Sequence, residues 1–210
     1  MIYDFTVLGL KPNTLGAVMP KLADAIAANS KRGKLIGCFS CDFGVLNRIA
    51  ILSEYPDARA LAEDRASTME SGDRFGFAEQ LASFERTAYA PLAFSDPIKP
   101  GKYGPFYEIR TYGIAPGGLQ PTSDAWGKGI GRRNELSKLL AVMGSMDTTP
   151  QRMLHIWPYA SLDHRAATRA RAPKRESGRR REVPTTYCRC NPSCLFPRRF
   201  RPCRERVGRR

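Results

Sequence analysis

The distribution of apolar and polar residues over the first 90 positions predicts six elements in the order β-α-β-β-α-β. Aromatic and β-branched residues form an extended run over 2–10. Apolar residues over 15–29 recur three or four positions apart, as in an amphipathic helix. The remaining elements are expected as strands at 34–41, 47–53 and 81–90 and a helix at 57–69. This order is that of a ferredoxin-like domain, in which two helices cover one face of an antiparallel sheet.

The same pattern returns later in the chain at a constant offset of 104 residues. Ile2-Tyr-Asp-Phe-Thr corresponds in this way to Phe106-Tyr-Glu-Ile-Arg. The offset also relates several isolated positions, among them Gly9 to Gly113, Pro12 to Pro116, Tyr55 to Tyr159 and Arg65 to Arg169. Two copies predict a duplicated domain, since a solenoid needs more repeats.

The second copy follows the first through its second helix. Its predicted elements are a strand at 106–114, a helix at 122–140, strands at 139–145 and 152–158, and a helix at 161–171 with Ser161 as N-cap. A segment with Pro and Gly, 97–104, is expected to link the copies. The predicted domains are therefore a first ferredoxin-like repeat over 1–96 and a second one over 105–172.

The last strand of the second copy is not evident in the sequence. The offset places it at 185–194, where Pro192 and several polar residues break any strand pattern. In the ferredoxin-like order this strand lies beside the strand that begins at Phe106. We therefore expect the second repeat to be incomplete and the Phe106 strand to have one unpaired edge.

Three motifs of the second copy resemble the NIPSNAP family. They are Phe106-Tyr-Glu-Ile-Arg-Thr-Tyr, then Pro116-Gly117 followed by Trp126 in the helix, and His155-Ile-Trp-Pro-Tyr-Ala-Ser-Leu-Asp-His-Arg. The resemblance covers 106–172 and, with fewer matches, 2–95. It implies an α+β fold similar to the dimeric α+β barrels, in which two ferredoxin-like sheets face each other. Two tandem repeats would supply both sheets within one chain.

Positive charge is concentrated at the C-terminal end of the chain. The formal net charge is +14, and residues 173–210 contain 13 Lys or Arg and 3 Asp or Glu, so +10 lies in this segment and +4 in the rest. We predict that 173–210 is a basic, disordered tail rich in Arg, Pro and Cys, and we hypothesise a frameshift near residue 172 as its origin. The alternative is a genuine tail that binds nucleic acid nonspecifically. No specific nucleic-acid site is expected.

The sequence also predicts where the protein resides. The N-terminal residues show no basic segment followed by an apolar core, which a secretion signal would need. No run approaches the roughly 20 apolar residues of a membrane-spanning helix. We expect a cytoplasmic protein without a membrane span.

Aromatic residues and arginines of the second copy form a candidate ligand-binding site. Aromatic walls with one or two cations suit a planar or acidic small molecule. The alternative interpretation is that the aromatic residues belong to the core and that the arginines pair with Glu108 or Asp163. The candidate ligand-binding residues are Tyr107, Arg110, Trp126, Tyr159 and Arg165.

His155 is the candidate catalytic base, because imidazole titrates near neutral pH. With Arg110 as an anion clamp, it would suit a cofactor-independent monooxygenase or isomerase of the dimeric α+β barrel type. That function requires both side chains in one closed polar pocket. His155 and His164 are the only histidines, too few for a metal site by themselves, and no metal or other cofactor is expected.

The predicted function is the binding of a small molecule or of a protein partner, without a dedicated catalytic constellation. The enzyme described above is the first alternative, and nucleic-acid binding through the tail is the second. Homodimer formation is left open by the sequence.

Overall fold

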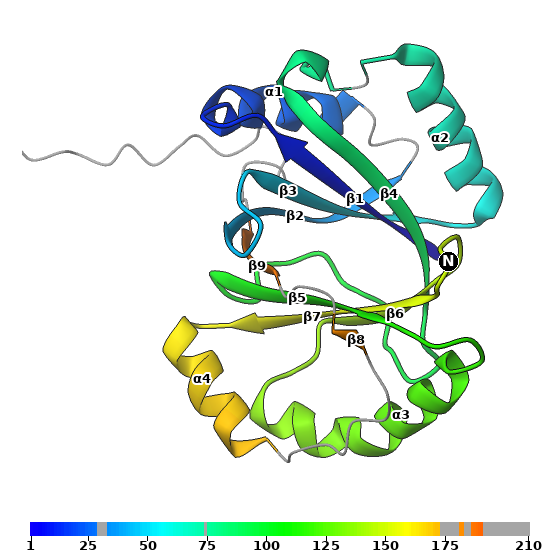
Figure 1. Cartoon of the computed structure of the whole chain (residues 1–210), viewed down its shortest axis with the longest axis vertical. Coiled ribbons are helices and arrows are strands. Elements are labelled where there is room, and N and C mark those ends of the chain that lie inside the picture. The colour runs from blue at the N-terminus through cyan, green and yellow to red at the C-terminus, as the bar shows by residue number, and fades with distance from the viewer. Residues whose placement is uncertain (29–32, 74, 173–180, 183–185, 191–210) are drawn as a thin grey trace, which may run out of the picture.

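The two halves of a curled antiparallel sheet face each other, and helices cover the outer face of each half (Figure 1). The computed structural model describes residues 1–28, 33–73, 75–172, 181–182 and 186–190. In these ranges, no helix is both long and apolar enough to cross a membrane. Most of the predicted basic tail lies outside the described residues.

The first repeat has the predicted β-α-β-β-α-β order. Asp57 caps the second helix, because its carboxylate accepts a hydrogen bond from the backbone N–H of Ala60 at 2.9 Å. The elements are β1 (Ile2–Leu10), α1 (Leu15–Ala28), β2 (Lys34–Phe43), β3 (Arg48–Tyr55), α2 (Ala58–Ser71), the short 3₁₀ helix η1 (Ala78–Gln80) and β4 (Leu81–Pro91).

The second repeat has the same order and the predicted N-cap. The hydroxyl of Ser161 accepts a hydrogen bond from the backbone N–H of His164 at 2.9 Å. The elements are β5 (Phe106–Gly113), α3 (Leu119–Leu136), β6 (Ala141–Ser145), β7 (Arg152–Tyr159), α4 (Leu162–Arg171), β8 (Arg181–Glu182) and β9 (Thr186–Cys190). Helix α3 starts three residues before the predicted 122–140, and it ends at Leu136 because the backbone is already extended at Ser137.

Seven strands form one continuous sheet in the order β2-β3-β1-β4-β6-β7-β5, and every pairing is antiparallel. The two repeats meet at β4 and β6, where Tyr89 lies opposite Ser145. This arrangement confirms the α+β fold of two ferredoxin-like repeats in a dimeric α+β barrel-like form.

Where the sequence shows no evident last strand for the second repeat, the structure has the short strand β9, and the expected unpaired edge of the Phe106 strand is not observed over Phe106–Ile109. β9 lies within the interval where the offset places that strand, and its backbone pairs with β5 on one side and β2 on the other. Cys188 is opposite both Tyr107 and Cys41. The edge of β5 is therefore paired over Phe106–Ile109, and β9 joins the two ends of the seven-stranded sheet. Whether residues 173–210 arise from a frameshift stays a hypothesis.

Side chains that point between the two half-sheets form the central core. It includes Tyr3, Phe39, Tyr107 and Ile156, all buried. Ile98, from the segment that links the repeats, belongs to the same core, and its backbone N–H donates to the hydroxyl of Tyr3 at 3.3 Å. Further apolar clusters lie between each half-sheet and its helices. Each strand thus has an inner face toward the shared core and an outer face toward the helices.

Candidate functional site

The alternation of β5 separates the candidate ligand-binding residues onto two sides of the sheet. Tyr107 points into the central core, where it is 1% exposed and its ring centroid lies 5.0 Å from that of Phe39. Arg110 is three positions further and projects from the outer face, toward the helices. Trp126 and Tyr159 also belong to the cluster on that outer face. The structure therefore does not bring Tyr107 together with the other four candidates.

Arg110 and His155 share the outer face of the second repeat, because they are directly opposite each other on β5 and β7. The imidazole is 2% exposed and surrounded by rings. The ring centroids of Tyr112, Trp126 and Trp157 lie 5.0, 4.9 and 6.2 Å from that of His155. The environment of His155 is thus an aromatic cluster between the sheet and α3.

A hydrogen bond from Trp157 fixes the tautomer of His155. The indole Nε1–H donates to Nδ1 of the imidazole at 2.7 Å. A neutral imidazole whose Nδ1 accepts this bond carries its proton on Nε2. In this arrangement His155 presents a donor at Nε2 instead of the lone pair that a general base needs.

Arg165 and Arg110 are engaged by Glu108, a carboxylate with a fully buried side chain. Glu108 is 2.6 Å from Arg165, 3.6 Å from Arg169 and 3.8 Å from Arg110. The Tyr159 hydroxyl donates to the same carboxylate at 3.5 Å. The arginines therefore pair with Glu108, as the alternative interpretation of the sequence expects.

A corresponding network lies under the helices of the first repeat. Asp4, the counterpart of Glu108, is 2.9 Å from Arg65 and 2.8 Å from Arg86. Arg86 also reaches Asp64 at 2.8 Å. Arg65 further pairs with Asp147, in the second repeat, at 2.7 Å. Both repeats thus hold a buried carboxylate on their first strand with an arginine from their second helix.

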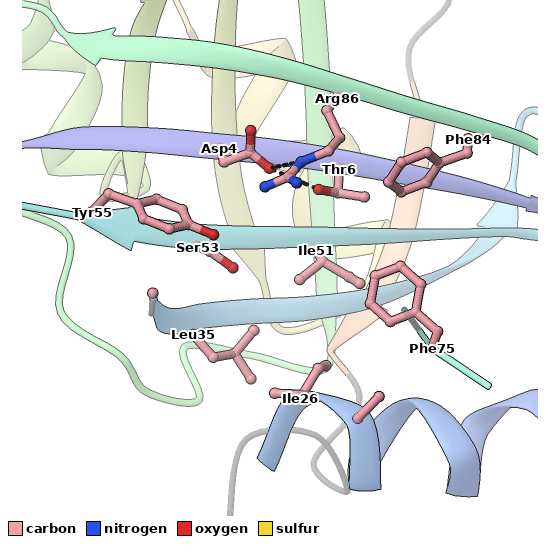
Figure 2. Close-up of a pocket in the computed structure, with 12 residues that line it drawn as sticks. Asp4, Thr6, Ile26, Leu35, Ile51, Ser53, Tyr55, Phe75, Phe84 and Arg86 are labelled. Atoms are coloured by element: carbon pink, nitrogen blue, oxygen red, sulfur yellow. Dashed lines mark hydrogen bonds and ion pairs between the residues drawn. The ribbon is translucent and has the colours of Figure 1, made fainter. Parts of the chain in front are cut away.

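A pocket opens beside this network, between the outer face of the first half-sheet and α1 (Figure 2). Its cavity volume is about 40 Å³, and one water needs about 10–15 Å³. It therefore holds about three waters or one small group of a ligand. Polar and apolar side chains both line it. The polar ones are Asp4, Thr6, Ser53, Tyr55 and Arg86, and the apolar ones include Ile26, Leu35, Ile51, Phe75 and Phe84.

Two phenylalanine side chains, Phe75 and Phe84, stand together in the pocket (Figure 2). The ring centroids of Phe75 and Phe84 are 6.2 Å apart in an edge-to-face arrangement. Phe84 is 42% exposed, which is unusual for a phenylalanine on a strand that a helix layer covers. The pair offers solvent-accessible apolar surface next to a polar floor.

The residues at equivalent positions of the two repeats explain why the pocket lies in the first repeat. His155 stands at the position that corresponds to Ile51, and Trp157 at the position of Ser53. Both side chains are buried, and they occupy with aromatic rings the layer that a serine and an isoleucine leave partly open. The size of the side chains at these two positions therefore decides which repeat has a pocket.

Burial and a neighbouring carboxylate keep the pocket tyrosine protonated. Burial, and after it the Asp64 carboxylate that accepts a hydrogen bond from the Tyr55 hydroxyl at 2.9 Å, raise the pKa of Tyr55 to about 12. Burial likewise raises the pKa of Tyr159 in the second repeat. At neutral pH the Tyr55 hydroxyl is a hydrogen-bonding group and not a base.

The sequence analysis missed the first-repeat residues because the family motifs lie in the second copy. One signal was available: Asp4 interrupts the apolar run Ile2-Tyr-Asp-Phe-Thr-Val, at the position of Glu108. An acidic residue inside a buried strand needs a partner, so it indicates a polar site. In the part of the chain that the structure describes, no group of three His, Cys, Asp or Glu is arranged to hold a metal ion.

Several solved structures have the same fold. An anthrone oxidase-like protein has a TM-score of 0.63 at 13% identity, over 90% of this chain and 91% of that chain. A candidate monooxygenase from Lactobacillus acidophilus NCFM has a TM-score of 0.61 at 13% identity, over 90% and 93%. Another from Fusobacterium nucleatum has a TM-score of 0.61 at 9% identity, over 90% and 91%. These likenesses show the fold alone.

The sequence comparison gives the family. Among curated proteins, none matches this chain. The family model described as NIPSNAP matches residues 3–96 and 107–188, which together are well over half of the chain and include both repeats and part of β9. The chain belongs to the NIPSNAP family.

Proposed function

We propose that this protein binds a small molecule in the pocket between the first half-sheet and α1. The observation that carries the proposal is the pocket itself, in which solvent-accessible phenylalanines stand beside buried hydroxyls and an ion pair. Small-molecule sites combine apolar walls with a few placed polar groups in this way. In the second repeat, the buried rings of Trp157 and His155 fill the corresponding space between the sheet and the helices.

The buried network supports the proposal because it holds the polar wall in place. Arg86 donates from Nε to Asp4, from Nη1 to Thr68 and from Nη2 to Asp64. Thr6 donates to the Asp4 carboxylate at 2.8 Å. Groups that are fixed by several hydrogen bonds bind a ligand without first losing conformational freedom.

The test is a ligand-detected thermal-shift screen of small aromatic and aliphatic compounds, followed by calorimetric titration of each compound that raises Tm. Ala25→Phe adds a ring on α1 at a residue that lines the pocket and is expected to weaken binding at least tenfold. Ala27→Phe, on the exposed side of the same helix, is the control. If neither variant changes the affinity of any compound, the ligand site lies elsewhere and the proposal is wrong.

A second candidate function is cofactor-independent oxygenation of an aromatic ligand in the same pocket. The proteins of this fold described above include two candidate monooxygenases and an anthrone oxidase-like protein, and Phe75 and Phe84 would contact a planar substrate. His155 and Arg110 do not line this pocket, so they would not act in it. Oxygen consumption with each compound from the screen tests this function, and binding without oxygen uptake contradicts it.

A further inference from the structure

Two of the hydroxyl groups that line the pocket donate their protons to buried carboxylates. The Thr6 hydroxyl donates to Asp4 at 2.8 Å, and the Tyr55 hydroxyl donates to Asp64 at 2.9 Å. Both carboxylates are buried, Asp64 completely. Each hydroxyl has one proton and two acceptor lone pairs. With that proton engaged, Thr6 and Tyr55 can only accept a hydrogen bond from a molecule in the pocket.

Ser53 adds a third hydroxyl to this wall. It is two positions before Tyr55 on β3 and therefore projects from the same face of the sheet (Figure 2). The polar wall formed by Thr6, Ser53 and Tyr55 therefore offers acceptors at all three hydroxyls, and among these hydroxyls only Ser53 can also donate. A ligand that brings N–H or O–H groups matches it, whereas a carboxylate brings only further acceptors.

The formal charge of the surrounding network favours the same kind of ligand. The carboxylates of Asp4, Asp64 and Asp147 face the guanidinium groups of Arg65 and Arg86, so three negative charges stand against two positive ones. The side chain of Arg86 lines the pocket but donates to both carboxylates beside it. The formal charge of these five paired side chains is −1, which favours a cation over an anion beside them.

The second repeat has an excess of positive charge at the corresponding place. There the single carboxylate of Glu108 lies within 4 Å of Arg110, Arg165 and Arg169. Asp64, which accepts the Tyr55 proton, is replaced by Thr168 at the offset of 104. The excess of acidic groups is thus particular to the repeat that contains the pocket.

From these contacts we propose that the pocket selects a small apolar molecule carrying a hydrogen-bond donor, and that a protonated amine binds more tightly than an alcohol and an alcohol more tightly than a carboxylate. This inference rests on the proposed function of the same pocket. The ammonium or hydroxyl group lies at Thr6, Ser53 and Tyr55, and the apolar part extends toward Phe75 and Phe84.

The test uses four probes with a common phenyl group: 2-phenylethylamine, 2-phenylethanol, phenylacetate and ethylbenzene. Their Kd values are measured by calorimetry on the full chain at pH 7 and fixed salt. The expected order is amine, alcohol, then carboxylate, with about a tenfold or larger difference between the amine and the carboxylate. A carboxylate that binds as tightly as the amine overturns the inference.

Two variants report on the acceptors directly. Thr6→Val and Tyr55→Phe each remove one hydroxyl and are expected to weaken amine binding about 3- to 10-fold, with the Kd of ethylbenzene unchanged within about twofold. Tyr159→Phe, the corresponding change in the second repeat, is the control and leaves both Kd values unchanged. Equal losses for the amine and ethylbenzene would indicate a structural effect and overturn the assignment of the acceptors.

The outcomes separate the inference from the proposed function. Binding of ethylbenzene that Ala25→Phe abolishes, with no preference among the polar probes, leaves the pocket as a ligand site and rejects the selectivity. The absence of binding by all four probes, together with a screen without hits, rejects both.

Discussion

At the scale of single residues, each repeat holds a carboxylate in the middle of an apolar strand. Asp4 is 1% exposed and accepts hydrogen bonds from Arg65, Arg86 and Thr6. A buried ion is tolerated only where partners replace its hydration. The network therefore positions the pocket wall, and its members depend on one another.

We predict that Asp4→Asn strongly destabilises the fold. The variant leaves two guanidinium groups facing a neutral amide in a buried environment, which typically costs about 3–5 kcal/mol of unfolding free energy. Urea unfolding at pH 7 measures the change. Glu63→Gln, which removes the exposed pair with Arg59, is the control and leaves the midpoint unchanged. A loss below about 1 kcal/mol for Asp4→Asn would show that the network is not a structural unit.

We predict that Tyr55 contributes to the loss of stability in alkali. Its pKa is raised to about 12, whereas an unfolded tyrosine titrates near 10. Between these pH values the native state keeps a proton that the unfolded state has lost, so stability falls by about 1.4 kcal/mol per pH unit for this group. Tyr55→Phe removes this part of the slope between pH 10 and 12. Identical slopes for the wild type and the variant contradict the assignment.

At the scale of elements, the helices and the first seven strands were predictable because their sequences carry local signals. The spacing from Leu15 to Ile26 indicates a helix, and Asp57 and Ser161 have the side chains that N-caps require. β9 was not predictable in this way. It is only five residues long, and Pro192 and polar residues follow it closely in the sequence; it forms a strand because the backbones of β2 and β5 both pair with it.

We predict that β9 is needed for a stable second repeat. Cys188→Pro removes a backbone N–H donor from a strand that is paired on both sides. The variant is expected to lower the urea midpoint and, by exposing the edge of β5, to promote self-association in light scattering. Cys188→Thr keeps the N–H and suits a strand, so it should behave like the wild type. Wild-type stability for the proline variant would mean that β9 adds nothing to the fold.

At the scale of the whole molecule, one shared core joins both repeats. Phe5 and Tyr89 of the first repeat pack with Tyr107 and Ile156 of the second. The location of the candidate site was less predictable than this architecture. The family motifs indicated the second repeat, which is rich in aromatic residues. A pocket, however, is space that side chains leave unfilled. The size of a side chain such as Ser53 determines that space only when the sheet and the helices are packed together.

We predict that the two repeats unfold together. Phe5→Ala removes a core ring in the first repeat and should cost about 3–5 kcal/mol. Both tryptophans, Trp126 and Trp157, lie in the second repeat, so their fluorescence reports on the other half of the molecule. Fluorescence and circular dichroism should shift to the same lower midpoint. A fluorescence midpoint that stays at the wild-type value would show that the repeats unfold independently.

The most direct measurement of the ligand site is a methyl-resolved NMR titration of the full chain with 2-phenylethylamine. The methyl groups of Ile26, Leu35 and Ile51 line the pocket, and Ile130 and Leu139 stand at the positions in the second repeat that correspond to the first two. A ligand in the pocket is expected to shift the first three signals in a saturable manner and to leave the other two unchanged. Saturable shifts at Ile130 and Leu139 without shifts at the pocket methyls would contradict the proposed site.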